Sequence, residues 1–108
     1  MHKSKKKVKT GNYTLKYGTY KGVDCWSTND PLSKYETTIV LNEDGTYTQT
    51  NVIIVADMTE NYYGTFTLSY DQSLGLIIKL SANDACYQIT GDNQFTSSTG
   101  SVIKYEEN

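Results

Sequence analysis

Alternation of apolar and polar residues is the feature that most limits how this chain folds. In residues 66–70 Phe, Leu and Tyr alternate with Thr and Ser, and residues 74–80 place leucine or isoleucine at every second position. A period of two puts alternate side chains on opposite faces of a β-strand, whereas a helix needs a period near 3.6. The chain is therefore expected to form strands nearly throughout and to contain no helix.

Turn-forming residues separate the alternating runs. Residues 42–45, Asn-Glu-Asp-Gly, have the form of a type I turn with glycine in the left-handed position, which makes a tight hairpin. Further turns are expected at 71–73, 83–84, 91–93 and 99–100. Ten tyrosines and fifteen threonines favour strands as well. Short strands at this spacing indicate an antiparallel meander, a sandwich or a barrel.

The alternation also predicts the core. Its inward positions should be occupied by Leu15, Ile39, Leu41, Phe66, Leu68, Leu76, Ile78, Leu80 and Ile89. The first strand is expected to run through Gly18. A Gly-Thr-aromatic triplet begins at Gly18, Gly45 and Gly64. In each triplet the glycine should allow a bend, the threonine should face solvent and the aromatic ring should enter the core.

The length of 108 residues suits one domain. We expect residues 1–11 to form a disordered basic arm and residues 12–108 to form a single β-domain. Five lysines crowd the first ten residues, whereas five lysines face twelve acidic residues from Gly11 onward. A solvated leader is favoured over an arm that binds a polyanion, because the acidic body would repel the same polymer. The chain also has no arginine, so no nucleic-acid partner is expected.

No apolar run is long enough for a signal-peptide core or a membrane span, so no transmembrane segment is expected. The chain is then either intracellular or exported with its signal removed.

The two cysteines, Cys25 and Cys86, could form one disulfide. Alternation argues against it, because Cys25 shares a face with Val23, which should point inward, and Cys86 shares one with Gln88, which should point outward. Free thiols are the favoured prediction.

The sequence argues against an enzyme. Its single histidine is His2, in the basic arm, so a Ser or Cys nucleophile has no imidazole partner in the body. The carboxylates lie mostly in turns and lack the spacing of a calcium loop. No catalytic residue, cofactor or metal is therefore expected.

Aromatic residues give the one positive functional signal. The expected contacts are Trp26 and Pro31 in the loop 25–34, Tyr35 at its end, and the pair Tyr62 and Tyr63, one of which must face outward. The partner could be a protein, a glycan or a small ligand. Trp26 could instead close one end of a barrel.

Four segments resemble the small lipocalin-like, calycin-type β-barrel domains of exported lipoproteins of Gram-positive bacteria. These segments are YGTYKG (17–22), TTIVLNEDGTYTQT (37–50), YYGTFTLSYDQSLGLIIKL (62–80) and YQITGDNQFTSSTGSVIKY (87–105). Gly18-Thr19-Tyr20 occupies the place of the lipocalin Gly-x-Trp signature, with Tyr in place of Trp, and the C-terminal helix of full lipocalins is missing. The resemblance implies an extracellular or cell-surface-anchored barrel, and it favours Trp26 as a plug.

The predicted fold is thus an all-β antiparallel meander of about eight short strands forming a small lipocalin-like barrel. Large inward side chains should fill its interior. The expected function is a non-enzymatic, exported binding or interaction module. Two alternatives are a small-molecule carrier that uses the barrel mouth and a secreted enzyme inhibitor that acts through loop 25–34.

Overall fold

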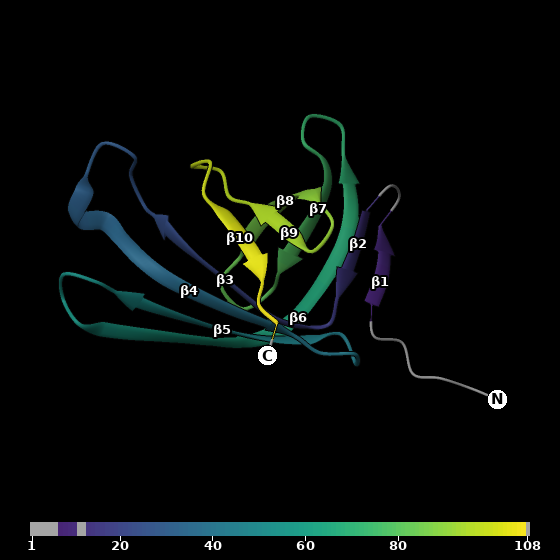
Figure 1. The fold of residues 1–108 in the computed structure, drawn as a ribbon, viewed down its shortest axis with the longest axis horizontal. Helices are drawn as coiled ribbons and strands as arrows, with labels where there is room; N and C mark the ends of the chain where they lie inside the picture. The colour runs from purple at the N-terminus through teal and green to yellow at the C-terminus, as the bar shows by residue number, and fades with distance from the viewer. Residues whose placement is uncertain (1–6, 11–12, 108) are drawn as a thin grey trace.

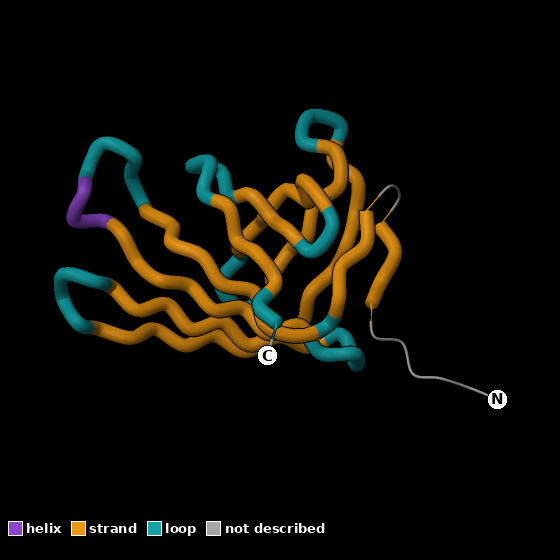
Figure 2. Tube along the Cα trace, viewed as in Figure 1, coloured by secondary structure: helices purple, strands orange, loops and turns teal. Residues whose placement is uncertain are grey.

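A computed structural model describes residues 7–10 and 13–107. Eight antiparallel strands close into a barrel in meander order, and β10 pairs back with β3 (Figures 1 and 2). The strands are β3 (Gly18–Cys25), β4 (Lys34–Leu41), β5 (Thr46–Ile53), β6 (Met58–Asp71), β7 (Gly75–Leu80), β8 (Ala85–Gly91), β9 (Gln94–Thr96) and β10 (Val102–Tyr105). The predicted all-β, eight-stranded barrel is confirmed.

A second, two-stranded sheet lies outside the barrel. It consists of β1 (Lys7–Thr10) and β2 (Tyr13–Lys16). The β8–β9 turn holds β2, because the Thr14 amide donates to Asp92 Oδ1 over 2.9 Å and the Asn93 amide donates to the Thr14 carbonyl over 2.8 Å. Leu15 is fully buried and joins the barrel core. The hairpin therefore packs against the barrel where the β8–β9 turn lies, and Leu15 extends from it into the core.

This hairpin corrects two expectations. The first strand does not continue through Gly18, because the chain bends there and residues 13–16 leave the barrel. The expected disordered arm over residues 1–11 is wrong for Lys7–Thr10, which pairs with β2 along four residues. An edge strand such as β2 presents unpaired backbone groups that a neighbouring segment can satisfy. Residues 1–6 and 11 lie outside the described part of the chain.

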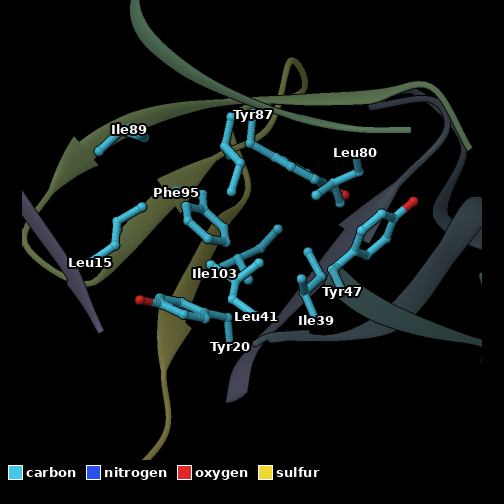
Figure 3. Packing of buried hydrophobic residues seen from close by; sticks show 11 residues of the cluster. Leu15, Tyr20, Ile39, Leu41, Tyr47, Leu80, Tyr87, Ile89, Phe95 and Ile103 are labelled. Carbon is cyan, nitrogen blue, oxygen red and sulfur yellow. The ribbon is translucent and has the colours of Figure 1, made fainter. Parts of the chain in front are cut away.

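Large apolar side chains occupy the barrel interior (Figure 3). The Tyr20 ring stacks on Phe95 with 4.6 Å between centroids, and Phe95 faces Tyr87 at 5.9 Å. The buried cluster is Leu15, Tyr20, Ile39, Leu41, Tyr47, Ile78, Leu80, Tyr87, Ile89, Phe95 and Ile103. The predicted core is confirmed, since its other three members, Phe66, Leu68 and Leu76, pack against this cluster while partly buried.

The Gly-Thr-aromatic triplets have different structural causes. Gly45 has a φ of 90° and its amide donates to the Asn42 carbonyl over 3.1 Å, so it closes the predicted hairpin turn. Gly64 instead makes room for a neighbour, because a Cβ there would lie 2.5 Å from Ser81 Oγ. The rings of Tyr20 and Tyr47 are fully buried, as expected from alternation.

The barrel ends unevenly on the side of the β3–β4 loop. Residues Met58–Thr65 of β6 pair with β5, whereas β7 pairs with β6 from Phe66 onward. Strands β3 to β6 consequently extend past β7, at the left of Figure 1. The β7–β8 turn folds against their inner face, where Tyr47 donates its hydroxyl to Asn83 Oδ1 over 2.7 Å. The β3–β4 loop and the β9–β10 turn remain at this end of the barrel.

Candidate binding site at the loop end of the barrel

The β3–β4 loop is held in one shape by its own hydrogen bonds. Asp30 caps a short 3-10 turn, Pro31–Ser33, and its Oδ1 accepts from the Leu32 amide over 2.9 Å. Pro31 suits the first turn, where its missing N–H has no partner to lose. The Ser33 hydroxyl lies 2.9 Å from the Ser27 carbonyl oxygen and 2.7 Å from that of Asp30. A loop that appears irregular in sequence is thus locally ordered.

Trp26 stands at the base of this loop, directly after β3. Its ring lies 4.8 Å from the Tyr35 ring, at an angle of 33° between planes. Tyr35 is 8% exposed, whereas Trp26 is 55% exposed. The interpretation of Trp26 as a barrel plug is therefore wrong. The two predicted contact residues do come together, with the buried Tyr35 ring supporting the exposed indole.

A pocket of about 430 Å³ opens beside this aromatic pair. This volume is within the range usual for small-molecule sites. The ends of β3 and β9 and the starts of β4 and β8 surround it. The lining residues are Asp24, Cys25, Trp26, Tyr35, Leu74, Asp84, Ala85, Cys86, Tyr87, Ser97, Ser98 and Thr99.

Asp24 organises one wall of the pocket although it is only 4% exposed. Its Oδ1 accepts from the Cys25 amide at 2.8 Å, from Ser97 Oγ at 3.0 Å and from Thr99 Oγ1 at 2.6 Å. Its Oδ2 accepts from the Tyr35 hydroxyl at 3.3 Å. The carboxylate thus ties the β9–β10 turn to β3 and β4. These donors are all neutral.

The phenols near Asp24 stay protonated well above neutral pH. Burial, reinforced by the charge of Asp24, raises the pKa of Tyr35 well above its ordinary value. Burial also raises the pKa of Tyr87 to about 12; Asp24 contributes, and the hydrogen bond from Gln49 partly offsets the rise. Both hydroxyls therefore remain neutral at physiological pH. The negative potential of Asp24 reaches both rings.

Polar side chains continue from the pocket along the inner wall. Gln49 is 1% exposed, and its Nε2 lies 2.9 Å from Thr37 Oγ1 and 3.1 Å from the Tyr87 hydroxyl. Asn83 Nδ2 donates to Gln49 Oε1 over 2.7 Å. Within the described residues, every buried side-chain polar atom has a hydrogen-bond partner. Satisfied networks of this kind fix side-chain positions, so the Tyr87 side chain, which lines the pocket, is held in place before a ligand binds.

Exposed apolar side chains gather beside the pocket, on two adjacent hairpin ends. The Ile54 amide donates to the Lys34 carbonyl over 3.3 Å and so joins the β5–β6 turn to the start of β4. We call the apolar tips the exposed residues Leu32, Ile54, Val55 and Met58, which are 50–62% exposed. Grouped exposed apolar residues often mark contact surfaces.

The remaining predicted contacts lie elsewhere. Tyr62 is partly buried and donates its hydroxyl to Glu60 Oε1 over 3.3 Å. Tyr63 is 75% exposed on the opposite face of β6, as alternation required of one member of the pair. Neither residue lines the pocket, and Pro31 contributes to the loop rather than to the lining.

Both cysteines are free thiols, as favoured from the sequence, and both line the pocket. The inward face predicted for Cys25 and Val23 is wrong. Val23 is 48% exposed, so Cys25 lies on an outward face and not on an inward one. Cys25 is partly buried and Cys86 is exposed.

Sequence reasoning missed Asp24, Ser97 and Thr99. Asp24 lies four residues after Tyr20 on the same strand, so alternation puts both side chains on the same face. Once the Tyr20 ring was expected in the core, Asp24 should have been expected to point inward as well. Its partners Ser97 and Thr99 are more than 70 residues away along the chain, and no sequence pattern links them to it.

The described residues contain no group of three or more His, Cys, Asp or Glu side chains that could hold a metal ion. None of their helical segments has the length and apolar character needed to cross a membrane. Comparisons with protein families, with curated proteins and with solved structures gave no match.

Proposed function

We propose that this protein is a non-enzymatic binding module that receives a small ligand, or a small group of a larger partner, in the pocket beside Trp26. One observation carries the proposal: an indole that is 55% exposed is held on a buried tyrosine at the rim of a pocket of about 430 Å³. An exposed tryptophan offers rigid contact area and a hydrogen-bond donor.

The rigidity of the surroundings supports the proposal. Pro31, the Asp30 cap and the Ser33 contacts restrain the loop before any ligand arrives. Asp24 restrains the β9–β10 turn in the same way. Preordered groups lose less conformational entropy on binding.

The proposal includes membership of the lipocalin-like lipoprotein domains and an extracellular or surface-anchored location. Its support is the eight-stranded meander barrel together with the four segments that resemble this family. The interior of an eight-stranded barrel is either filled by side chains or holds one small ligand. Large side chains fill this one (Figure 3), which leaves the mouth as the place for a ligand.

A second candidate is a protein inhibitor that acts through loop 25–34. The apolar tips favour it, because Leu32 projects from that loop and Ile54, Val55 and Met58 extend the same end of the molecule. A target with an apolar groove could accept these side chains.

A fragment screen by ¹H–¹⁵N NMR tests the proposal. Binding fragments should shift the indole N–H of Trp26 and the amides of Ser97–Thr99, because these residues all line the pocket. Shifts confined to Leu32, Ile54 and Val55 would favour the inhibitor. Hits scattered over the barrel, or none, would contradict both. Trp26→Ala should remove the pocket hits, whereas Tyr63→Ala, which removes an exposed aromatic outside the pocket, should keep them.

A further inference from the structure

We propose, resting on the function proposed above, that the pocket selects an organic ammonium group carried on an apolar body. A free alkylamine and a lysine side chain present the same chemistry. Three properties of the lining support an ammonium ligand: its negative charge, a carboxylate oxygen that can accept another hydrogen bond, and its aromatic rings.

The charge of the lining is entirely negative. Asp24 and Asp84 are its carboxylates, and no lysine is among the lining residues. The two ion pairs of the described residues, Lys16 with Glu107 and Lys21 with Glu106, involve neither aspartate. An anionic ligand would therefore be repelled from this pocket, and a cation would be attracted.

Asp24 gives this attraction a specific place. It is 4% exposed and receives hydrogen bonds from neutral groups, and it has no ion-pair partner among the described residues. Its Oδ1 has three donors, whereas Oδ2 has the Tyr35 hydroxyl at 3.3 Å. A carboxylate has about four lone-pair sites, so Oδ2 retains capacity for another donor. An ion pair in a partly desolvated site is stronger than one in water.

The aromatic residues suit the same ligand. Trp26, Tyr35 and Tyr87 all line the pocket. A cation within about 6 Å of an aromatic face is attracted by the ring, and tryptophan gives the strongest attraction. Leu74 and Ala85 add apolar lining for the body of the ligand. A neutral sugar could stack on Trp26, but it would gain nothing from the charge of Asp24.

Trp26 is the one tryptophan of the chain, so its fluorescence reports binding directly. The probes are 4-phenylbutylamine, 4-phenylbutanol and 4-phenylbutyrate, which share one apolar body and differ in charge. At pH 7 and low salt the amine should bind at least about tenfold more tightly than the alcohol, and the carboxylate should bind least. Added salt should weaken the binding of the amine and leave the affinity for the alcohol unchanged.

The two sources of the ammonium group are then separated. Nα-acetyl-lysine methylamide tests a lysine side chain, and its Nε-acetylated form is the matched neutral control. Selective binding of the free amine alone assigns a small-molecule source. Selective binding of the lysine derivative over its acetylated form assigns a peptide source.

A pair of variants tests whether the pocket charge is responsible. Asp84→Asn removes one lining carboxylate, and Asp57→Asn removes an exposed carboxylate outside the lining. Both residues have left-handed backbones, with φ of 57° and 53°, which asparagine tolerates. Asp84→Asn should lower the affinity for the amine several-fold without changing the affinity for the alcohol. Asp57→Asn should change neither affinity.

Equal affinities for amine and alcohol would overturn the ammonium inference while leaving a binding pocket in place. If Asp84→Asn and Asp57→Asn change the affinity for the amine equally, the ammonium group does not bind in this pocket. If no cationic probe alters Trp26 fluorescence, the ammonium inference is wrong, and the fragment screen decides separately whether the pocket binds anything.

Discussion

The indole of Trp26 rests on the ring of Tyr35 at 4.8 Å, with the tryptophan largely exposed and the tyrosine buried. Tyr35 in turn donates its hydroxyl to Asp24, which holds the β9–β10 turn. One chain of contacts thus connects an exposed aromatic ring to the β9–β10 turn, whose residues also line the pocket. A change at Trp26 should affect the surface, whereas a change at Asp24 should affect how the end of the barrel is assembled.

Gly64→Ala should destabilise the protein by about 1–3 kcal/mol, the range for overpacking. The new Cβ would lie 2.5 Å from Ser81 Oγ and 3.1 Å from the Ala82 backbone nitrogen, so the β7–β8 turn must move. Gly91→Ala is the matched control, because its Cβ would meet its nearest neighbour at an ordinary 3.7 Å. Urea denaturation measures both, and equal stabilities would show that the turn does not approach Gly64 closely.

Deleting residues 1–10 should lower the melting temperature by more than a few degrees, the shift that about 1 kcal/mol produces in a domain of this size. The deletion removes β1, the pairing partner of β2, and β2 carries the fully buried Leu15. Leu15→Ala should cost about 2–5 kcal/mol in free energy of unfolding by creating a cavity. A truncated protein that melts at the same temperature would indicate that β1 contributes nothing to stability.

Stability should fall between about pH 10 and pH 12. The pKa of Tyr87 rises from an ordinary value near 10 to about 12 in the folded protein, and that of Tyr35 is raised as well. The unfolded chain therefore releases these protons first as pH increases, and deprotonation favours unfolding. A shift of this size corresponds to about 2–3 kcal/mol.

Urea midpoints at pH 9 and pH 11, with tyrosinate absorbance in parallel, measure this alkaline effect. The stabilisation contributed by the two protonated phenols is fully present below about pH 10. Unchanged midpoints would show that the two phenols are not buried as described.

Both thiols should react with a chromogenic disulfide reagent in the native state, and Cys86 should react faster. Cys86 is exposed and Cys25 is partly buried. Reactivity follows access to the thiolate when other factors are similar. Mass spectrometry after brief alkylation identifies which cysteine is labelled first. Failure of both to react without prior reduction would indicate a disulfide between them.

The barrel and its core were predictable because alternation directly encodes which side chains face inward. Ile78 and Leu80 obey it, and the Asn42–Gly45 turn fixes the register of its hairpin. The departure of β2 from the barrel was missed although a signal exists. The inward residue of β2, Leu15, has an odd number, whereas the inward residues of β3, such as Tyr20, have even numbers. A continuous strand would keep the same alternation, so this change marks the bend at Gly18.

The site was harder to predict than the fold. Trp26 follows the last residue of β3, so alternation does not determine which way its side chain points. The pocket also depends on contacts between Asp24 and the β9–β10 turn, which the folded barrel alone brings together. Tyr62 and Tyr63 were plausible by residue type, but their strand positions place them outside the pocket lining.

Comparing Trp26→Ala with Tyr63→Ala, using the tightest fragment from the screen, tests whether Trp26 is an exposed contact residue of the pocket. Because Trp26 is exposed, its loss should lower the free energy of unfolding by about 1 kcal/mol or less. The same change should weaken binding by about tenfold or more, whereas Tyr63→Ala should leave the affinity unchanged. Unchanged affinity in Trp26→Ala, or a stability loss of about 3–5 kcal/mol typical of a buried aromatic, would show that Trp26 is not an exposed contact residue.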